Sequence, residues 1–146
     1  MLFRSSLLAG YVSDYLANKL LDLAFRNQAY SAPDTYCALT TATISDDNTG
    51  STITEVSAGG YARKQVNVNG GSEPTWDLAS GSALDNTHNV DIGPASASWG
   101  TVVALGICDA STAGNLLLYD NAVADQAVGD GDTVRFPAGD LDISMS

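Results

Sequence analysis

Two apolar runs separated by a turn-rich segment occupy residues 99–120. In the first run, residues 102–108, apolar side chains stand at both odd and even positions, so a strand there is apolar on both faces. The second run contains Leu116-Leu117-Leu118 and has the same two-sided character. A hairpin with one face in water alternates apolar with polar residues. This pattern therefore predicts a β-hairpin in the middle of a sheet, packed on a second layer and, on its other face, on a helix or a neighbouring subunit.

Most of the remaining chain alternates apolar and polar residues over short segments separated by turns. In residues 141–145, for example, Leu141, Ile143 and Met145 share one face, which is typical of a half-buried strand. Because no helical segment lies between these strands, we expect a mainly β fold, an antiparallel β-sandwich or jelly roll of about eight strands. The predicted strands are residues 36–41, 53–56, 61–69, 89–92, 102–108, 115–119, 124–128, 133–136 and 141–145.

A single amphipathic helix is predicted near the N-terminus, over residues 13–26. Leu16, Leu20 and Leu23 follow helical spacing, and Ala17, Leu21 and Ala24 widen this apolar stripe. Ser13 is a suitable N-cap residue. We expect one face of the helix to dock on the sheet or on a partner. The predicted organisation is an N-terminal arm, residues 1–12, followed by one β-rich domain, residues 13–146.

Two segments contain apolar side chains for which the sequence allows two locations each. The arm contains Leu2, Phe3, Leu7, Leu8 and Tyr11, which we expect either to order on a neighbouring protein or to form a first edge strand of the domain's own sheet. Its apolar run is interrupted by serines and a glycine, so we do not expect a cleaved signal peptide. The loop predicted at residues 70–82 has Trp76 as its one large apolar side chain, which either closes the end of the sandwich or lies in a contact.

Charge narrows the range of partners. The chain has 6 Lys and Arg against 17 Asp and Glu, a net charge of −11, and only Arg63 and Lys64 are adjacent basic residues. Such a chain repels nucleic acid phosphates and anionic lipid surfaces, so neither a nucleic acid nor a membrane is an expected partner. No apolar run approaches the roughly 20 residues that a spanning helix needs, so we expect a soluble protein.

The residues needed for common catalytic and metal sites are few. His88 is the only histidine and lies in a polar loop, and Cys37 and Cys108 are expected to be buried reduced thiols, with a disulfide between them as the alternative. Asp130 and Asp132 supply oxygens that calcium prefers, but an Asp in a Gly-rich turn is ordinary turn chemistry. We therefore expect no enzyme, no cofactor and no metal site.

At these residues the chain resembles a family of small structural proteins from tailed-bacteriophage virions, often labelled tail-fibre-like. Similar small β-proteins serve as capsid cement. The ordered set that carries the resemblance runs from about Leu16 to the C-terminus. It consists of Leu16-Ala-Asn-Lys-Leu-Leu-Asp22, Thr35-Tyr-Cys-Ala-Leu-Thr-Thr41, Gly59-Gly-Tyr-Ala-Arg63, Trp99-Gly-Thr with Gly106-Ile-Cys-Asp109, Gly114-Asn-Leu-Leu117, and Gly131-Asp-Thr-Val-Arg-Phe-Pro-Ala-Gly-Asp-Leu141.

The resemblance implies a virion structural protein that works by attachment. Our first hypothesis is a cement or decoration protein on the capsid exterior, bound to the major capsid protein as a symmetric dimer or trimer. Its partner-binding side chains would be Leu2, Phe3, Leu7, Leu8, Tyr11 and Trp76. The alternative is a tail-fibre or baseplate component that binds the host surface, with Tyr30, Trp76 and Tyr119 available to stack on sugars. A glycan hydrolase using Asp130 and Asp132 is the third and least supported hypothesis.

Overall fold

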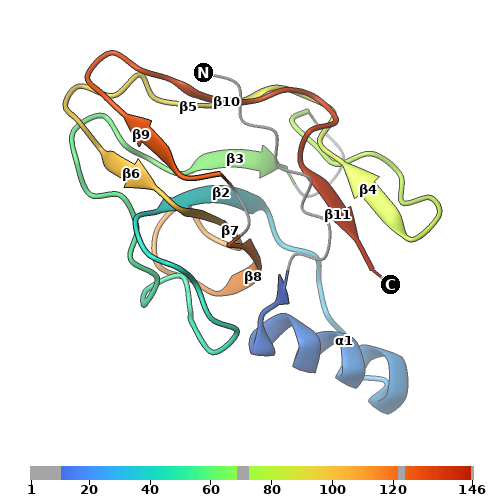
Figure 1. Ribbon diagram of the computed structural model, residues 1–146. Helices are drawn as coiled ribbons and strands as arrows, with labels where there is room; N and C mark the ends of the chain where they lie inside the picture. The colour runs from blue at the N-terminus through green and yellow to red at the C-terminus, as the bar shows by residue number, and fades with distance from the viewer. Residues whose placement is uncertain (1–10, 69–72, 122–123, 146) are drawn as a thin grey trace.

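The computed structural model describes residues 11–68, 73–121 and 124–145, and within them the chain forms one helix and eleven short strands (Figure 1). Every strand pair is antiparallel, so the expected mainly β, sandwich-like fold with one helix near the N-terminus is confirmed. The elements are β1 (Tyr11–Val12), α1 (Asp14–Arg26), β2 (Thr35–Thr40), β3 (Lys64–Asn67), β4 (Ala83–Asp85), β5 (Val90–Ile92), β6 (Gly100–Val102), β7 (Ala104–Cys108), β8 (Leu116–Asp120), β9 (Gln126–Val128), β10 (Val134–Phe136) and β11 (Asp142–Ser144).

The largest sheet has five strands in the order β1-β8-β7-β2-β3. The predicted central hairpin is confirmed, because β7 and β8 pair inside this sheet and all five residues of β7 are buried. A register shift follows Ile107, which pairs with Leu118, whereas Cys108 pairs with Leu116. Leu117 is thus an extra residue on β8, a β-bulge that lets neighbouring leucines face the same side. Strand β6 leaves the hairpin and pairs with β9 instead.

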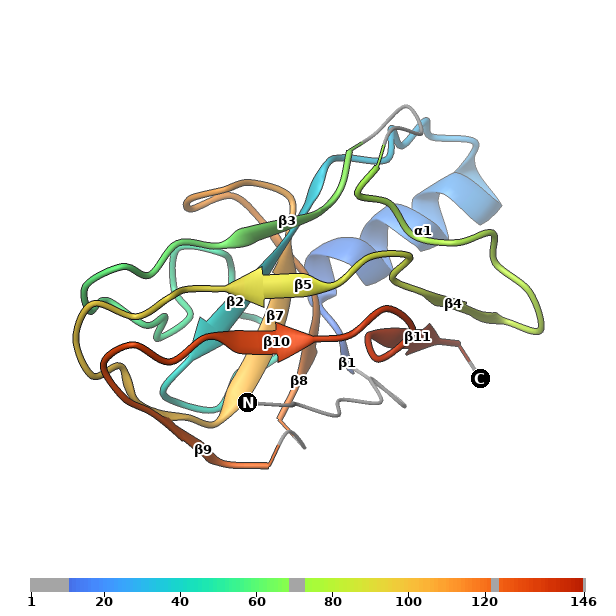
Figure 2. The same cartoon turned by 90° about the horizontal axis from the view of Figure 1, so that it is seen from above.

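The main core lies on one face of this sheet. Figure 2 shows β5 and β10 side by side, running across β7 and β8 as a second layer. Fully buried side chains from both layers, among them Leu39, Leu105, Ile92 and Phe136, form one continuous cluster. This packing of a sheet against a two-stranded ribbon explains why most strands are short: each needs only enough length to cross the core.

The other face of the sheet is covered by the chain itself. Ile44 and Ile53, from the connection between β2 and β3, pack on buried side chains of β2, β7 and β8, among them Ala104 and Leu116. The expectation that a helix or a neighbouring subunit covers this face was therefore wrong, because a loop does so. At Gly106 of β7, an added Cβ atom would lie 2.9 Å from a methyl group of Leu116 and 3.5 Å from a methyl group of Ile44, so the glycine leaves room for the Leu116 side chain on which the loop packs.

Two strand predictions differ from the structure, and the short strand β4 was not predicted. Residues 53–56 belong to the covering loop and make only an isolated bridge between Thr40 and Glu55. The strand predicted at 61–69 begins at Lys64, and a bulge at Val66 breaks the expected alternation, so that Val66 is buried while Lys64 is exposed. The sequence pattern did not predict β4, because three residues are too few to show an alternation. The strand is recognised in the structure by its pairing with β11.

Both cysteines are buried free thiols, as expected. Cys37 belongs to the main core, whereas Cys108 belongs to the cluster on the opposite face of the sheet. Side chains that point to opposite faces cannot approach to disulfide distance. Burial raises the pKa of Cys108 to about 11 and raises the pKa of Cys37 further. Both groups are therefore uncharged thiols at neutral pH.

Candidate attachment surface

Helix α1 is anchored to the sheet at its first turn. Ser13 is fully buried, and its hydroxyl donates to the carbonyl of Leu116 at 2.5 Å and accepts from the backbone N–H of Leu16 at 3.2 Å. This confirms Ser13 as the predicted N-cap. The backbone N–H of Asp14 also donates to Asp46 in the covering loop at 2.8 Å. Tyr15 and Leu16 then pack against the main core, so the start of the helix has a fixed position.

Beyond its first turns, α1 leaves the body of the protein and no residue of the helix is fully buried. Leu16 and Leu20 are half-buried, but Leu21 is 56% exposed and Phe25 is 82% exposed, and Leu23 is also exposed. The expected docking on the sheet thus holds only for the beginning of the apolar stripe. The end of the helix presents apolar side chains to water, which is unusual for a helix that serves only its own core.

A second apolar surface lies on the ribbon formed by β4 and β11. A groove of about 360 Å³ opens there, lined by Ala79, Ser82, Ala83, Leu84, Ile143 and Met145. Met145 is 62% exposed, and Leu78 beside the groove is 90% exposed. Met145 continues the alternation of Leu141 and Ile143, but it extends past the core that buries Leu141. The same pattern that fills the core therefore continues into solvent.

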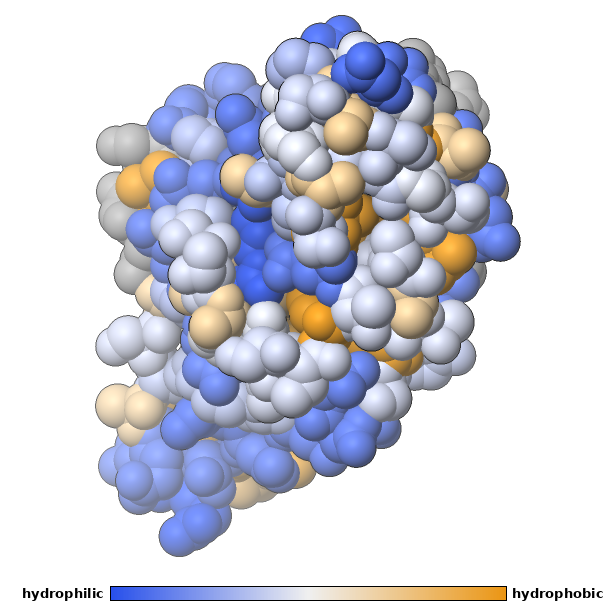
Figure 3. Space-filling view, turned by 90° about the vertical axis from the view of Figure 1, so that its left-hand side faces the viewer, coloured by the Kyte–Doolittle hydropathy of each residue, from blue (hydrophilic) through white to orange (hydrophobic). Residues whose placement is uncertain are grey.

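These two places hold five of the six large apolar side chains that are exposed in the described part of the chain: Leu21, Leu23, Phe25, Leu78 and Met145. The sixth, Tyr11, lies in β1. Figures 1 and 2 show α1 and the β4–β11 ribbon at the same end of the molecule. The opposite face, seen in Figure 3, is mostly polar, with apolar atoms visible in a narrow seam. An apolar patch confined to one end of a small protein is typical of an interaction site. We call this end, defined by α1 and the β4–β11 ribbon, the α1 end.

The predicted partner-binding residues are spread over several environments. Leu2, Phe3, Leu7 and Leu8 lie outside the described residues. Tyr11 lies in the edge strand β1, is 61% exposed, and stacks on Tyr119 with ring centroids 5.3 Å apart. Trp76 packs against the main core, and its indole N–H donates to the hydroxyl of Thr35 at 3.0 Å. Tyr119 is itself buried, so its ring is not open to a sugar.

A buried arginine network was not predicted. All five N–H donors of Arg63 are used: three go to backbone carbonyls of Gly50, Ala110 and Ala113 at 2.7–2.9 Å, and two go to the carboxylate of Glu55 at 2.8 Å. Tyr61 also donates to Glu55, at 2.6 Å. Burial lowers the pKa of Arg63, but the hydrogen bonds and charge of Glu55 outweigh this and raise it. The network fastens the covering loop to the β7–β8 turn and is structural.

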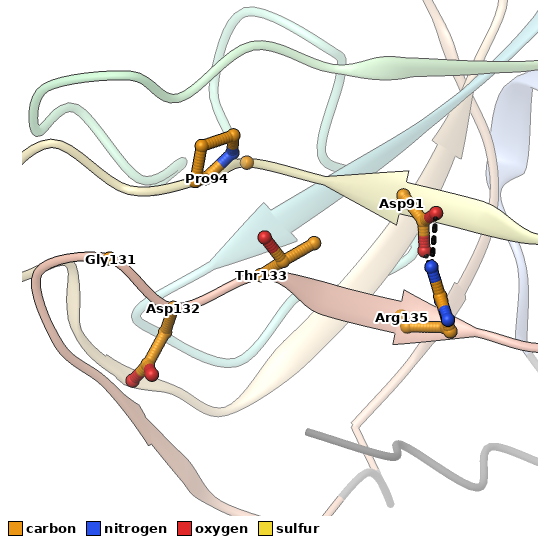
Figure 4. Close-up of a pocket in the computed structure, with 7 residues that line it drawn as sticks. Asp91, Pro94, Gly131, Asp132, Thr133 and Arg135 are labelled. Carbon is orange, nitrogen blue, oxygen red and sulfur yellow. Dashed lines mark hydrogen bonds and ion pairs between the residues drawn. The ribbon is translucent and has the colours of Figure 1, made fainter.

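An open polar groove of about 600 Å³ lies beside β5 and β10 (Figure 4). Its main feature is a two-point ion pair in which Arg135 donates to Asp91 at 2.6 and 2.8 Å. The hydrogen bonds and charge of Arg135 lower the pKa of Asp91. The carboxylate of Asp132 accepts from the backbone N–H of Gly129 at 2.8 Å and so closes a turn. These carboxylates are used by the fold itself.

The remaining candidate features are the histidine, possible metal ligands and a possible membrane-spanning helix. His88 is exposed, and its Nδ1 lies 2.7 Å from a carboxylate oxygen of Glu73. Within residues 11–68, 73–121 and 124–145, no group of three or more His, Cys, Asp or Glu side chains is arranged to hold a metal ion. In the same residues, no helix is long and apolar enough to cross a membrane.

The described residues form a small β-sandwich with exposed apolar side chains at one end. The family model described as podophage GP4 fiber I protein gp80 matches residues 11–144, nearly all of the chain. The protein therefore belongs to this family of phage fibre proteins, which confirms the resemblance to tailed-bacteriophage virion proteins and makes it a virion component. A search of curated proteins found no match.

Proposed function

We propose that this protein is a non-enzymatic subunit of a fibre on the phage tail, which works by binding neighbouring virion proteins through its α1 end. The observation that carries the proposal is the family match over residues 11–144, since that family is described as a fibre protein. The apolar side chains at the α1 end supply a surface for attachment. The main core is closed without Leu21, Phe25 and Met145, which supports a role for these side chains outside the fold.

A capsid cement or decoration protein on the head exterior is the second candidate. The observation in its favour is the form of the chain, a single small β-sandwich without the repeats that long fibre shafts contain. In that role the protein would bind the major capsid protein as a symmetric oligomer. The acidic net charge of −11 suits either place, because it prevents binding to the packaged DNA.

Location and copy number distinguish the two candidates. Gold-labelled antibodies against the purified protein should decorate tails and leave heads bare, and quantitative mass spectrometry should find few copies per particle. Labelled heads with copies in the hundreds would instead establish the cement role. Particles that lack the protein, made by deleting its gene, are the control for antibody specificity.

The lack of enzymatic activity is a separate part of the proposal. Asp132 is engaged in a turn and Asp91 in an ion pair, which leaves neither as a free acid or base in the polar groove. Purified protein should not degrade host surface polysaccharide. Turnover that disappears in an Asp130→Asn, Asp132→Asn variant would refute this part and restore the hydrolase hypothesis.

A further inference from the structure

We propose that the exposed end of α1 from one copy of this chain packs into the β4–β11 groove of a second copy, so that the protein is a symmetric oligomer. The proposal goes beyond the fibre assignment and does not depend on it. It commits to a second copy as the occupant of both apolar surfaces. Three properties of the described residues support it: the distribution of exposed apolar side chains, the shapes of the two surfaces, and the distribution of charge.

The exposed apolar side chains form two patches that complement each other in shape. The helix is convex and offers Leu21 and Phe25, while the β4–β11 ribbon offers a groove lined by Leu84, Ile143 and Met145. An amphipathic helix laid in an apolar groove is a common mode of recognition. One contact of this kind covers both patches at once, whereas a helix-to-helix contact would leave the groove open.

The position of the patches suits a closed assembly. The helix α1 and the β4–β11 ribbon lie at the same end of the molecule (Figures 1 and 2). In an assembly with a symmetry axis through that end, each copy would insert its helix into the groove of another copy, so the contact would form at least twice. Repetition matters because a stable interface buries roughly 1,200–2,000 Å² in total, more than one short helix end can bury alone. The mostly polar face in Figure 3 is left in solvent.

The charges of the two surfaces are complementary. The chain has no Lys or Arg between Lys64 and Arg135, so the segment that forms β4 is acidic, and Asp140 and Asp142 adjoin the other side of the ribbon. Asp85 and Asp142 are directly paired across the strands. Among the described residues, Oδ1 of Asp142 is a buried side-chain oxygen without a hydrogen-bond partner. The helix carries the cations Lys19 and Arg26 together with the carboxylates Asp14 and Asp22. Arg26 is paired with Asp22 at 3.3 Å, so Lys19 is the helix cation that can approach the acidic ribbon.

Carboxylates that face one another without a cation raise each other's pKa. Burial, followed by the charges of Asp142 and Asp77, raises the pKa of Asp85. A neighbouring cation would relieve this repulsion, and the flexible side chain of Lys19 lies one helical turn from the exposed Leu23. Association thus covers apolar surface and compensates like charge in one step.

Two experiments on the purified full-length protein test the proposal. In the first, light scattering coupled to size-exclusion chromatography measures the mass of the wild type and of a Leu21→Glu, Phe25→Glu variant. We expect the wild type to be a dimer or larger closed oligomer, and the double substitution to weaken association by about tenfold or more. The matched control, Thr112→Glu in the exposed β7–β8 turn, should associate normally. A monomeric wild type, or a double variant that associates normally, would overturn the proposal.

The second experiment identifies the surfaces in contact. Phe25→Cys and Met145→Cys proteins, one of which carries a mass tag, are mixed and oxidised. The native cysteines are buried and should not form disulfides. The proposal predicts that disulfides between the two variants dominate. Disulfides of Phe25→Cys with itself in excess would show a helix-to-helix contact instead, and cross-linking no faster than with Thr112→Cys would show no contact at either surface. Both results would overturn the proposal.

Discussion

Two regions of the protein differ in how completely the chain covers their apolar side chains. Around β7, the covering loop at residues 41–56 closes the second face of the sheet. Arg63 donates three hydrogen bonds to that loop and two to the β7–β8 turn. At the α1 end, Leu21, Phe25 and Met145 stand in solvent with nothing of the described chain over them. The first region completes its own packing, whereas the second ends with apolar side chains still exposed.

This difference separates stability from attachment. A β-sandwich of this size can be stable through its main core and its fastened loop alone. Substitutions around β7 should therefore unfold the protein, while substitutions at the α1 end should leave it folded and change what it binds. Five measurements test this difference between the two regions.

The largest expected effect is on thiol reactivity. The pKa of Cys108 is about 11 because the thiol is buried, and that of Cys37 is raised further, so neither forms a thiolate at pH 8. Both should react with an aromatic disulfide reagent about a thousandfold or more slowly in the folded protein than in urea. A thiol introduced by Ser111→Cys on the exposed turn should react at once. Fast labelling of a native cysteine would show that the sheet is not covered as described.

Replacing a phenylalanine should change the free energy of unfolding very differently in the two regions. Phe136 is fully buried in the main core, so Phe136→Ala should lower the free energy of unfolding by about 3–5 kcal/mol. Phe25 is exposed, so Phe25→Ala should change it by less than about 0.5 kcal/mol. Urea denaturation at concentrations where the chains are separate gives both values. A large loss with Phe25→Ala would place the helix end inside the cooperative core.

The arginine network should be costly to break. Arg63→Ala leaves three carbonyls without this donor and leaves Glu55 with Tyr61 as its remaining donor, so it should cost about 3–5 kcal/mol in the same assay. Arg63→Lys should also destabilise, because an ammonium group cannot replace the five-donor fork. Arg135→Ala is the matched control, since its pair with Asp91 is exposed. Equal effects at the two arginines would contradict the assignment of the fastening role to Arg63.

A modest gain is expected at the β4–β11 ribbon. Asp142→Asn removes one of two directly paired carboxylates and should stabilise the separate chain by about 0.2–1 kcal/mol at pH 7. Because the pKa of Asp85 is raised in the folded state, the repulsion is present at neutral pH and is relieved as the pH falls through that raised value. Asp142→Asn should weaken this pH dependence. An unchanged pH profile would show that the two carboxylates do not interact.

The smallest effect concerns the exposed ion pair. The pKa of Asp91 is lowered by Arg135, so its contribution is present above about pH 4 and is lost as the pH falls through the lower folded value. Asp91→Asn should cost less than about 1 kcal/mol at low salt and less still at high salt. A cost comparable with that of Arg63→Ala would mean that the polar groove has a structural role.

The hairpin and the helix start could be predicted because their signals are local. Residues 102–108 are apolar on both faces, which identifies a central strand, and Ser13 precedes the helical period directly. The covering loop could not be predicted, because Ile44 and Ile53 are isolated apolar residues within a polar segment. Their packing partners on β7 and β8 lie more than fifty residues away in the sequence.

The exposed part of α1 and the Arg63 network could not be predicted for the same reason. Helical spacing identifies the apolar side of α1, but it does not tell how much of that side the chain itself covers. Arg63 alternates with apolar residues as a surface arginine does, and its carbonyl partners leave no signal in the sequence. Both features arise from contacts between distant segments, which a pattern along the chain does not record.

The account rests on attachment through the α1 end, and incorporation into particles tests this most directly. A phage that lacks the gene is grown in cells supplying either the wild type, the Leu21→Glu, Phe25→Glu variant or the Thr112→Glu control, and the copies per purified particle are counted by mass spectrometry. We predict that the double variant remains folded but is incorporated about tenfold less or lower, while the control matches the wild type. A folded double variant present at the wild-type copy number would contradict the account.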